Sequence, residues 1–147
     1  MGHTFTDVFV HCIFSTKDRR DVIPAEIQPN LWAYIHGIAK NLKVHTLAVG
    51  GTGNHSHVLL LLPPTLNLSE LVQKLKANSS RWMGEKGIQF TWQQGFAAFS
   101  VSPSMLEKVK RYIRSQPEHH RKRSFEEEFT AYLRAAGIET PINPLLD

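Results

Sequence analysis

The sequence predicts an α+β fold of the ferredoxin-like type, a split βαβ sandwich in which an antiparallel sheet carries helices on one face, followed by C-terminal helices. Two observations carry this prediction. Segments with strand and helix character follow one another as strand, helix, strand, strand, helix, strand and helix, the order of the split βαβ unit. The 147 residues, 41% of them hydrophobic, are enough for one core, so we expect a single domain.

The first four elements each have a distinct signal. Residues 5–16 are rich in β-branched and aromatic side chains, which favour a strand. Apolar residues at helical spacing predict a helix over 24–42, with Pro24 in its first turn. Strands are expected over 43–51 and 55–62, and two prolines after the second stop it because proline cannot donate to a ladder.

The later elements follow the same logic. A helix is expected over 67–87, with Asn67 or Ser69 as its N-cap and a glycine at its end. Residues 90–102 predict a fourth strand, interrupted near Gly95, and 103–116 a third helix.

We place the core of the single domain, 1–147, at about 4–116 and a helical extension at about 117–147. The extension carries an apolar stripe at helical spacing, which predicts a helix that docks on the core or on a partner chain. The stripe consists of Phe125, Phe129, Tyr132, Leu133 and Ala136.

Charge and composition narrow the classes of partner. The formal net charge is +4 and the basic residues occur in clusters, which favours a polyanionic partner. Cys12 is the only cysteine, so an intrachain disulfide and a thiolate zinc site are excluded. The longest leucine run is far shorter than the roughly 20 apolar residues of a membrane span. We therefore expect a cytoplasmic protein with no membrane partner.

Two histidines stand one residue apart where the third strand begins. His55 and His57 share one face of this strand, because alternate side chains point the same way. Two adjacent imidazoles at the exposed end of a strand have the geometry to bind one divalent cation. A pair of partly exposed histidines without a role is the alternative, and a cation site would need a third ligand.

The third helix offers that ligand and a nucleophile. Tyr112 and Gln116 are four residues apart and share a helix face. An amide oxygen suits a hard cation, and a phenol attacks a phosphate that a cation polarises. Tyr132 fits the apolar stripe of the extension, and Tyr34 has no polar partner at helical spacing. The structural alternative for Tyr112 is a tyrosine at the edge of an apolar stripe.

Several motifs, in this order and spacing, resemble the HUH single-tyrosine transposases of the two-hundred-series insertion sequences and their REP-associated relatives. The motifs are "NHSHVLLLLPP", "KLKANSSRWM", "WQQGFAAFSVS" and "VKRYIRSQPEHHRKRSFEEEF". The resemblance covers nearly the whole chain. Where the family usually has a large apolar residue between the histidines, this sequence has Ser56, which faces away from the histidines and so affects packing more than chemistry.

The resemblance implies a metal-dependent enzyme that cleaves and rejoins single-stranded DNA at hairpins through a 5′-phosphotyrosine. It implies Tyr112 as nucleophile, His55, His57 and Gln116 as ligands of Mg²⁺ or Mn²⁺, and a homodimer whose tyrosine helix acts in trans. Such a protein is nucleoid-associated when bound to DNA. We expect basic side chains to follow the phosphates: Lys17, Arg19, Arg20, Lys74, Lys76, Arg81, Lys108 and Arg111. Trp82 and Trp92 either stack on bases or belong to the core, and the core is favoured.

Three other functions compete with that of a transposase. A histidine-triad hydrolase needs a third alternating histidine, and position 59 is leucine. An RNA-binding ferredoxin-like module needs aromatic-rich inner strands, which are missing. A domesticated relative that binds hairpin DNA without mobilising it is the serious alternative.

Overall fold

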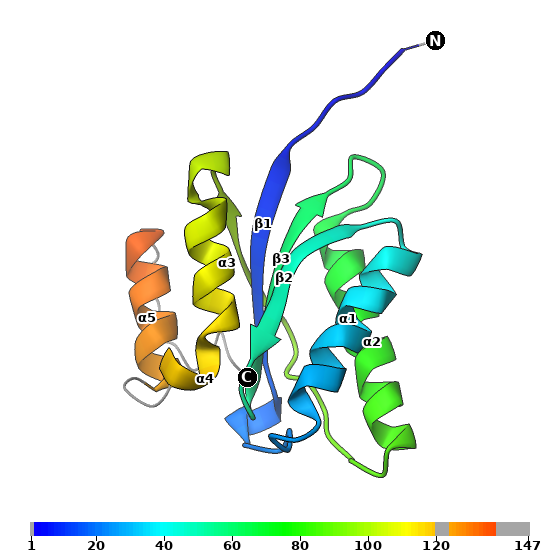
Figure 1. Cartoon of the computed structure of the whole chain (residues 1–147), viewed down its shortest axis with the longest axis vertical. Helices are drawn as coiled ribbons and strands as arrows, with labels where there is room; N and C mark the ends of the chain where they lie inside the picture. Colours follow the sequence, from blue (N-terminus) through cyan, green and yellow to red (C-terminus); the bar gives the residue numbers. More distant parts are fainter. Residues whose placement is uncertain (1, 120–123, 138–147) are drawn as a thin grey trace.

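The computed structural model describes residues 2–119 and 124–137, and within them four strands form one antiparallel sheet with helices against both faces (Figure 1). The elements in chain order are β1 (Val8–Ser15), η1 (Lys17–Arg19), α1 (Gln28–Asn41), β2 (His45–Gly51), β3 (His55–Leu62), α2 (Leu68–Glu85), β4 (Ala97–Val101), η2 (Pro103–Met105), α3 (Leu106–Arg114), α4 (Gln116–His119) and α5 (Phe125–Ala135). The strand order is β2-β3-β1-β4. The predicted fold class is confirmed.

Strand β3 lies inside the sheet and is covered on both sides. Val58 belongs to the main core with α1 and α2, whereas Leu59 packs against Ile113 of α3. Figure 1 shows α1 and α2 on one side of the sheet and α3 and α5 on the other. By strand alternation, His55 and His57 share the face of Leu59. The histidines therefore lie between the sheet and the C-terminal helices.

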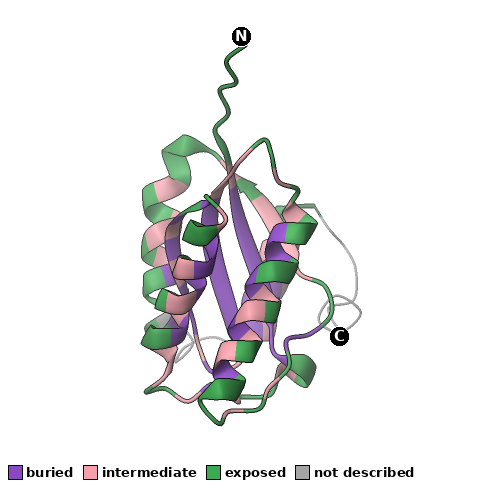
Figure 2. Cartoon of the chain, turned by 90° about the vertical axis from the view of Figure 1, so that its right-hand side faces the viewer, coloured by how far each residue is buried: buried purple, intermediate pink, exposed green. Residues whose placement is uncertain are grey.

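Three separate apolar clusters hold these layers together, and one of them packs Ile113 of α3 against Ala48 and Leu59 of the sheet. The main core fills the space between the sheet and α1 and α2, where Figure 2 shows buried residues on the strands and on the inner helix faces. Each fully buried Leu or Phe there contributes roughly 1.5–3 kcal/mol relative to exposure. A smaller cluster attaches α5 to the sheet through Ile13, Phe125, Phe129 and Leu133. The attachment of α5 thus rests on few side chains.

Two helix starts show how local signals compete. The prediction that Pro24 lies in the first turn of α1 is wrong: its carbonyl accepts from the Ile27 N–H at 3.0 Å in a preceding turn, and Pro29 occupies the first helical turn. Both Pro24 and Pro29 suit the first turn of a helix, so the sequence pattern alone does not distinguish between them. For α2 the expected cap is confirmed, because the Asn67 side chain accepts from the Glu70 N–H at 2.8 Å.

The predicted third helix is interrupted, and the fourth strand is shorter than expected. A 3-10 turn precedes α3, the helix ends at Arg114, and Gln116 begins the separate short helix α4. Strand β4 covers only Ala97–Val101. Gly95 has φ +82°, a left-handed conformation, which confirms the expected interruption there.

A glycine on β2 lets α3 lie directly on the sheet. A Cβ at Gly50 would stand 2.5 Å from the carbonyl oxygen of Ile113 and 3.0 Å from its Cγ2. Any side chain at position 50 therefore displaces α3. The Gly50 carbonyl also accepts from the buried Ser56 hydroxyl at 3.3 Å, so the polar residue between the two histidines has a partner. Gly50 thus sets the distance between α3 and the sheet.

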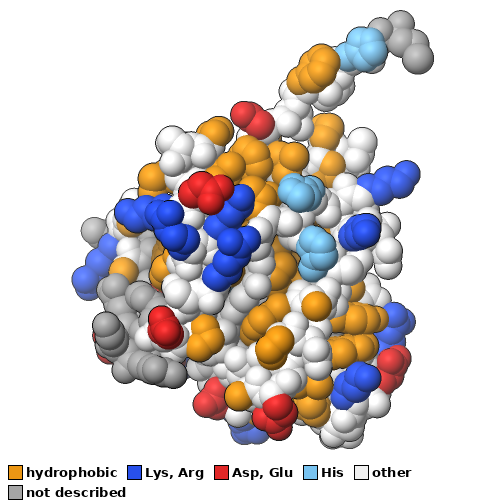
Figure 3. Space-filling model, viewed as in Figure 1, with side chains coloured by type: hydrophobic (Ala, Val, Ile, Leu, Met, Phe, Trp, Pro, Cys, Tyr) orange, Lys and Arg blue, Asp and Glu red, His pale blue; other side chains and the backbone are white. Residues whose placement is uncertain are grey.

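Basic side chains gather over α3 on the face shown in Figure 3. They come from Lys108, Lys110, Arg111 and Arg114. No helix in the described ranges is long and apolar enough to cross a membrane.

Candidate active site

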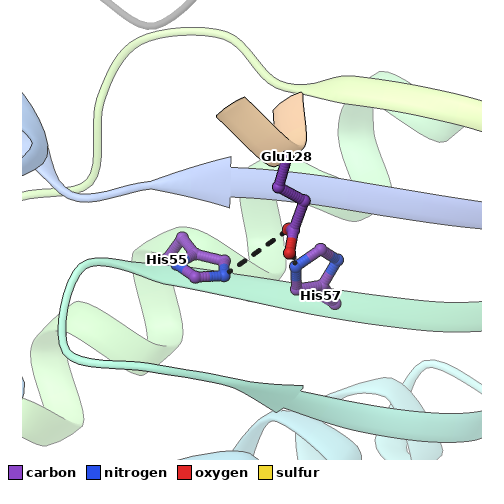
Figure 4. Close-up of side chains that lie close together, drawn as sticks. All are labelled: His55, His57 and Glu128. Atoms are coloured by element: carbon purple, nitrogen blue, oxygen red, sulfur yellow. Dashed lines mark ion pairs between the residues drawn. The ribbon is translucent and has the colours of Figure 1, made fainter. Parts of the chain in front are cut away.

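Two histidines of β3 and a glutamate of α5 meet between the sheet and the C-terminal helices (Figure 4). His57 Nε2 lies 3.0 Å and His55 Nε2 lies 3.9 Å from Glu128 Oε1. The two imidazole centroids are 4.9 Å apart, as expected for side chains on one strand face. The expectation that these histidines are exposed is wrong, because both have 0% exposure and α5 packs over this end of β3, with Phe125 stacked on His55.

The other two residues predicted for the site reach the same place. Gln116 Oε1 lies 2.9 Å from His55 Nε2, although α3 ends before Gln116. The Gln116 amide N–H donates to the Tyr112 carbonyl at 3.3 Å, which keeps the two residues adjacent across the helix break. The Tyr112 ring stands edge-on to His57 at 5.6 Å, and its buried hydroxyl lies close to Glu128. One chain therefore brings all four predicted residues together.

The outer nitrogen of each histidine also has a partner. His55 Nδ1 lies 2.8 Å from Asn54 Oδ1 and 3.0 Å from Thr52 Oγ1. When Nε2 of His55 gives its lone pair to a cation, the proton is on Nδ1 and is donated to Asn54, because an amide oxygen only accepts. His57 Nδ1 lies 2.8 Å from Nε2 of His11, a buried residue of β1. Such partners orient the imidazoles of metal sites.

This donor set fits a divalent cation. Ligand atoms of His55, His57 and Glu128 lie within 4.8 Å of one another, and the Gln116 amide oxygen faces the same point. Imidazole nitrogens and oxygen ligands suit first-row divalent metals and Mg²⁺. A buried carboxylate is costly without a balancing charge, which a cation supplies. The group is consistent with a divalent metal.

Burial and the carboxylate set the protonation of the neighbouring rings. Burial, together with the hydrogen bond to Glu128 and its negative charge, raises the pKa of Tyr112 well above its ordinary value, and a hydrogen bond to Gln116 acts in the opposite direction. Burial and the neighbouring His57 lower the pKa of His11 well below its usual range, against the charge of Glu128. The phenol and the His11 ring are therefore neutral at pH 7.

Sequence reasoning missed Glu128. Helix α5 begins at a regular cap, where the Ser124 hydroxyl accepts from the Glu127 N–H at 3.2 Å. Glu128 stands three residues after Phe125 and four before Tyr132, so it falls within the apolar stripe of this helix. The sequence signal that points to Glu128 is a carboxylate within a stripe of apolar residues.

The basic residues predicted to follow DNA do not form one surface. Lys74 and Arg81 on α2 lie on the opposite side of the sheet from Lys108 and Arg111 on α3 (Figure 1). Lys17 and Arg20 are exposed at and after η1.

Three of the predicted cations have partners in the described part of the chain, and one of them, Arg81, donates to Asn78 Oδ1 of its own helix at 3.0 Å. Arg19 pairs with Glu126 of α5 at 3.3 Å. Lys76 donates to the carbonyls of Gln93, at 2.9 Å, and Gly95. These contacts tie Arg19 and Lys76 to neighbouring segments.

The two tryptophans differ in their surroundings. Trp92 is buried and its indole N–H donates to the Ser79 hydroxyl at 3.0 Å, which confirms the favoured core assignment. Trp82 is half-buried and stacks on Tyr34 with ring centroids 4.8 Å apart.

Comparisons with known proteins give a consistent result. The transposase of insertion sequence IS200 from Salmonella typhimurium and that from Salmonella typhi are each 25% identical over 126 residues, 80% of this chain and 82% of theirs. A transposase candidate from Deinococcus radiodurans R1 superposes with a TM-score of 0.61 at 22% identity, covering 79% of this chain and 96% of that one. A REP-associated tyrosine transposase bound to a REP hairpin superposes with a TM-score of 0.59 at 15% identity, covering 82% and 72%.

The family model for IS200-like transposases matches residues 4–116, which include both histidines, the tyrosine and the glutamine. The two structural matches agree with the α+β fold described above. Since the family match spans most of the chain, this protein belongs to the IS200-like transposases, a family of DNA-processing enzymes.

Proposed function

We propose that this transposase cleaves and rejoins single-stranded DNA at hairpins through a covalent 5′-phosphotyrosine intermediate. The observation that carries the proposal is the position of Tyr112, whose buried hydroxyl lies close to Glu128 while its ring stands edge-on to His57. Transfer of a phosphoryl group to tyrosine needs a phenol close to a group of metal ligands, and this site has both. That a related transposase was solved with a REP hairpin supports DNA hairpins as the substrate.

His55, His57 and Gln116, joined by Glu128, are proposed to hold Mg²⁺ or Mn²⁺. A bound divalent cation neutralises charge on the scissile phosphate and polarises it for attack. Asn54 and His11 orient the two imidazoles from behind. The four ligand side chains thus lie on three elements: β3, α4 and α5.

The proposed reaction is a transesterification. The Tyr112 oxygen forms a bond to phosphorus, the bond from phosphorus to the 3′ oxygen breaks, and the phenol proton is balanced by the 3′ hydroxyl that leaves. One phosphodiester replaces another, so a second 3′ hydroxyl reverses the step without ATP. Joining therefore uses the same groups as cleavage.

Access to the site requires a change in α5. His55, His57 and Gln116 are fully buried, and Glu128 is 2% exposed. Glu128 therefore completes the ligand set only while α5 covers the site, and it gives way to the phosphate when α5 moves aside. The basic side chains of η1 and α3 are proposed to hold the DNA backbone around that opening, and those of α2, on the other side of the sheet, to hold a more distant part of the strand.

The proposal includes a homodimer in which the tyrosine helix of one chain serves the histidines of the other. Its support is the family resemblance, while the single chain has Tyr112 beside its own His57. A domesticated protein that binds hairpins without cleaving them is the second candidate, because the buried site admits no phosphate while α5 stays in place.

A labelled hairpin with single-stranded flanks tests the proposal. With Mg²⁺ or Mn²⁺, the wild-type protein should form an adduct that survives denaturation, and the labelled peptide should contain Tyr112. Tyr112→Phe keeps the ring and removes the hydroxyl, so it should bind the hairpin and form no adduct. Hairpin binding without an adduct in the wild-type protein would support the domesticated candidate, and an adduct on another residue would overturn the nucleophile.

A further inference from the structure

A third histidine, His11, contacts the ring nitrogen of His57 that faces away from Glu128. Its Nε2 lies 2.8 Å from His57 Nδ1, the ring centroids are 5.0 Å apart, and its side chain is buried. His11 stands opposite Leu59 in the register of β1 and β3, and His57 stands opposite Ile13. The two histidines are therefore diagonal neighbours on one face of the sheet.

The contact between two rings restricts where their protons lie. A neutral imidazole has one N–H, and a metal-binding nitrogen has none. If His57 binds a cation through Nε2, its proton is on Nδ1 and is donated to His11. His11 then accepts through Nε2 and carries its own proton on Nδ1. The direction of this hydrogen bond decides whether His57 Nε2 is a ligand.

Packing alone does not explain a histidine at this position. Among the described residues, Nδ1 of His11 is buried and has no hydrogen-bond partner, which destabilises the folded chain. The edges of Tyr112 and Tyr132 surround the ring, at centroid distances of 6.3 and 5.2 Å. An apolar side chain would avoid that cost, so the acceptor nitrogen is what distinguishes histidine here.

We propose that His11 is a positioning residue that fixes the tautomer and the orientation of His57, so that Nε2 of His57 faces the divalent cation. Asn54 holds the corresponding nitrogen of His55. Each histidine of β3 thus has its own acceptor, one from the preceding turn and one from the neighbouring strand. This inference rests on the proposed metal site.

Calorimetric titration with Mn²⁺ tests the role of the acceptor. His11→Leu should lower affinity about 10- to 100-fold, the usual effect of removing a partner behind a metal ligand. His11→Gln places an amide oxygen near the position of Nε2 and should restore most of the affinity. Ile13→Val, a buried change on the same face without a polar group, is the control and should bind as the wild type does.

Nitrogen-15 NMR of the wild-type protein with Mg²⁺ tests the tautomer without any variant. We expect the His57 proton on Nδ1. A proton on Nε2, wild-type affinity in His11→Leu, or a His11→Gln affinity no better than that of His11→Leu would each overturn the inference. If the wild-type protein binds no Mn²⁺, the metal site fails with it; normal binding and DNA cleavage in His11→Leu would refute only the role of His11.

Discussion

At the scale of single residues, Glu128 is the only buried carboxylate among the described residues. Glu128→Gln keeps the shape and one oxygen donor but removes the negative charge. We expect Mn²⁺ affinity to fall at least about tenfold, because a ligand matters no less than the groups behind it. Calorimetry on the purified variant measures this loss.

Glu127→Gln is the matched control, since Glu127 is the exposed neighbour on the same helix. It should bind Mn²⁺ as the wild-type protein does. Unchanged affinity in Glu128→Gln, together with a large loss in Gln116→Ala, would show that the glutamine and not the glutamate completes the site.

The residues of the site differ in how far the sequence reveals them. His55 and His57 follow from strand alternation, and Tyr112 and Gln116 from helical spacing, because these relations are local. His11 and Glu128 meet His57 only through the strand register and the docking of α5. The spacing of residues along one strand or helix shows neither of these contacts, so the sequence did not predict His11 or Glu128 as part of the site.

At the scale of elements, α5 is held by a cluster separate from the main core. Phe129→Ala removes a fully buried ring from this cluster, at a cost of about 3–5 kcal/mol. We expect α5 to open while the rest of the sheet stays folded, because local opening follows local contacts. Hydrogen exchange should rise in α5 and stay unchanged in α1 and β3.

Leu75→Ala provides the comparison, because Leu75 is equally buried in the main core. That variant should lower protection throughout α1, α2 and the sheet. If Phe129→Ala lowers protection of β3 as much as that of α5, the two clusters form one cooperative unit and α5 does not open alone.

Element types were predicted better than their limits. The order of strands and helices and the cap at Asn67 follow from strong local signals. The break before Gln116 does not, because nothing in 103–116 disfavours a continuous helix until Pro117. In the structure α3 ends at Arg114, and Gln116, which follows the break, contacts His55.

At the scale of the whole molecule, the proposed homodimer with sites shared between chains makes a distinct prediction. A Tyr112→Phe chain lacks the nucleophile and a His57→Ala chain lacks a ligand. When the two are mixed, one site of a heterodimer regains both parts, so adduct formation should return in part. The adduct should lie only on the His57→Ala chain, which two tags of different mass would show.

A site formed within one chain gives no rescue in this mixture. Each variant alone is the control and should form no adduct. Light scattering that reports only monomers at working concentrations would also argue against the shared site.

The packing of α3 on the sheet is sensitive to the residue at position 50, which is glycine. The layer that carries the tyrosine and the layer that carries the histidines are kept apart by the thickness of two backbones, with no room for one methyl group between them. A substitution at Gly50 that alters none of the reactive residues would act as a wedge and move α3, and with it Tyr112, away from the histidines of the same chain. How far the sequence of β2 can vary without loss of the reaction thus depends partly on a residue that has no side chain.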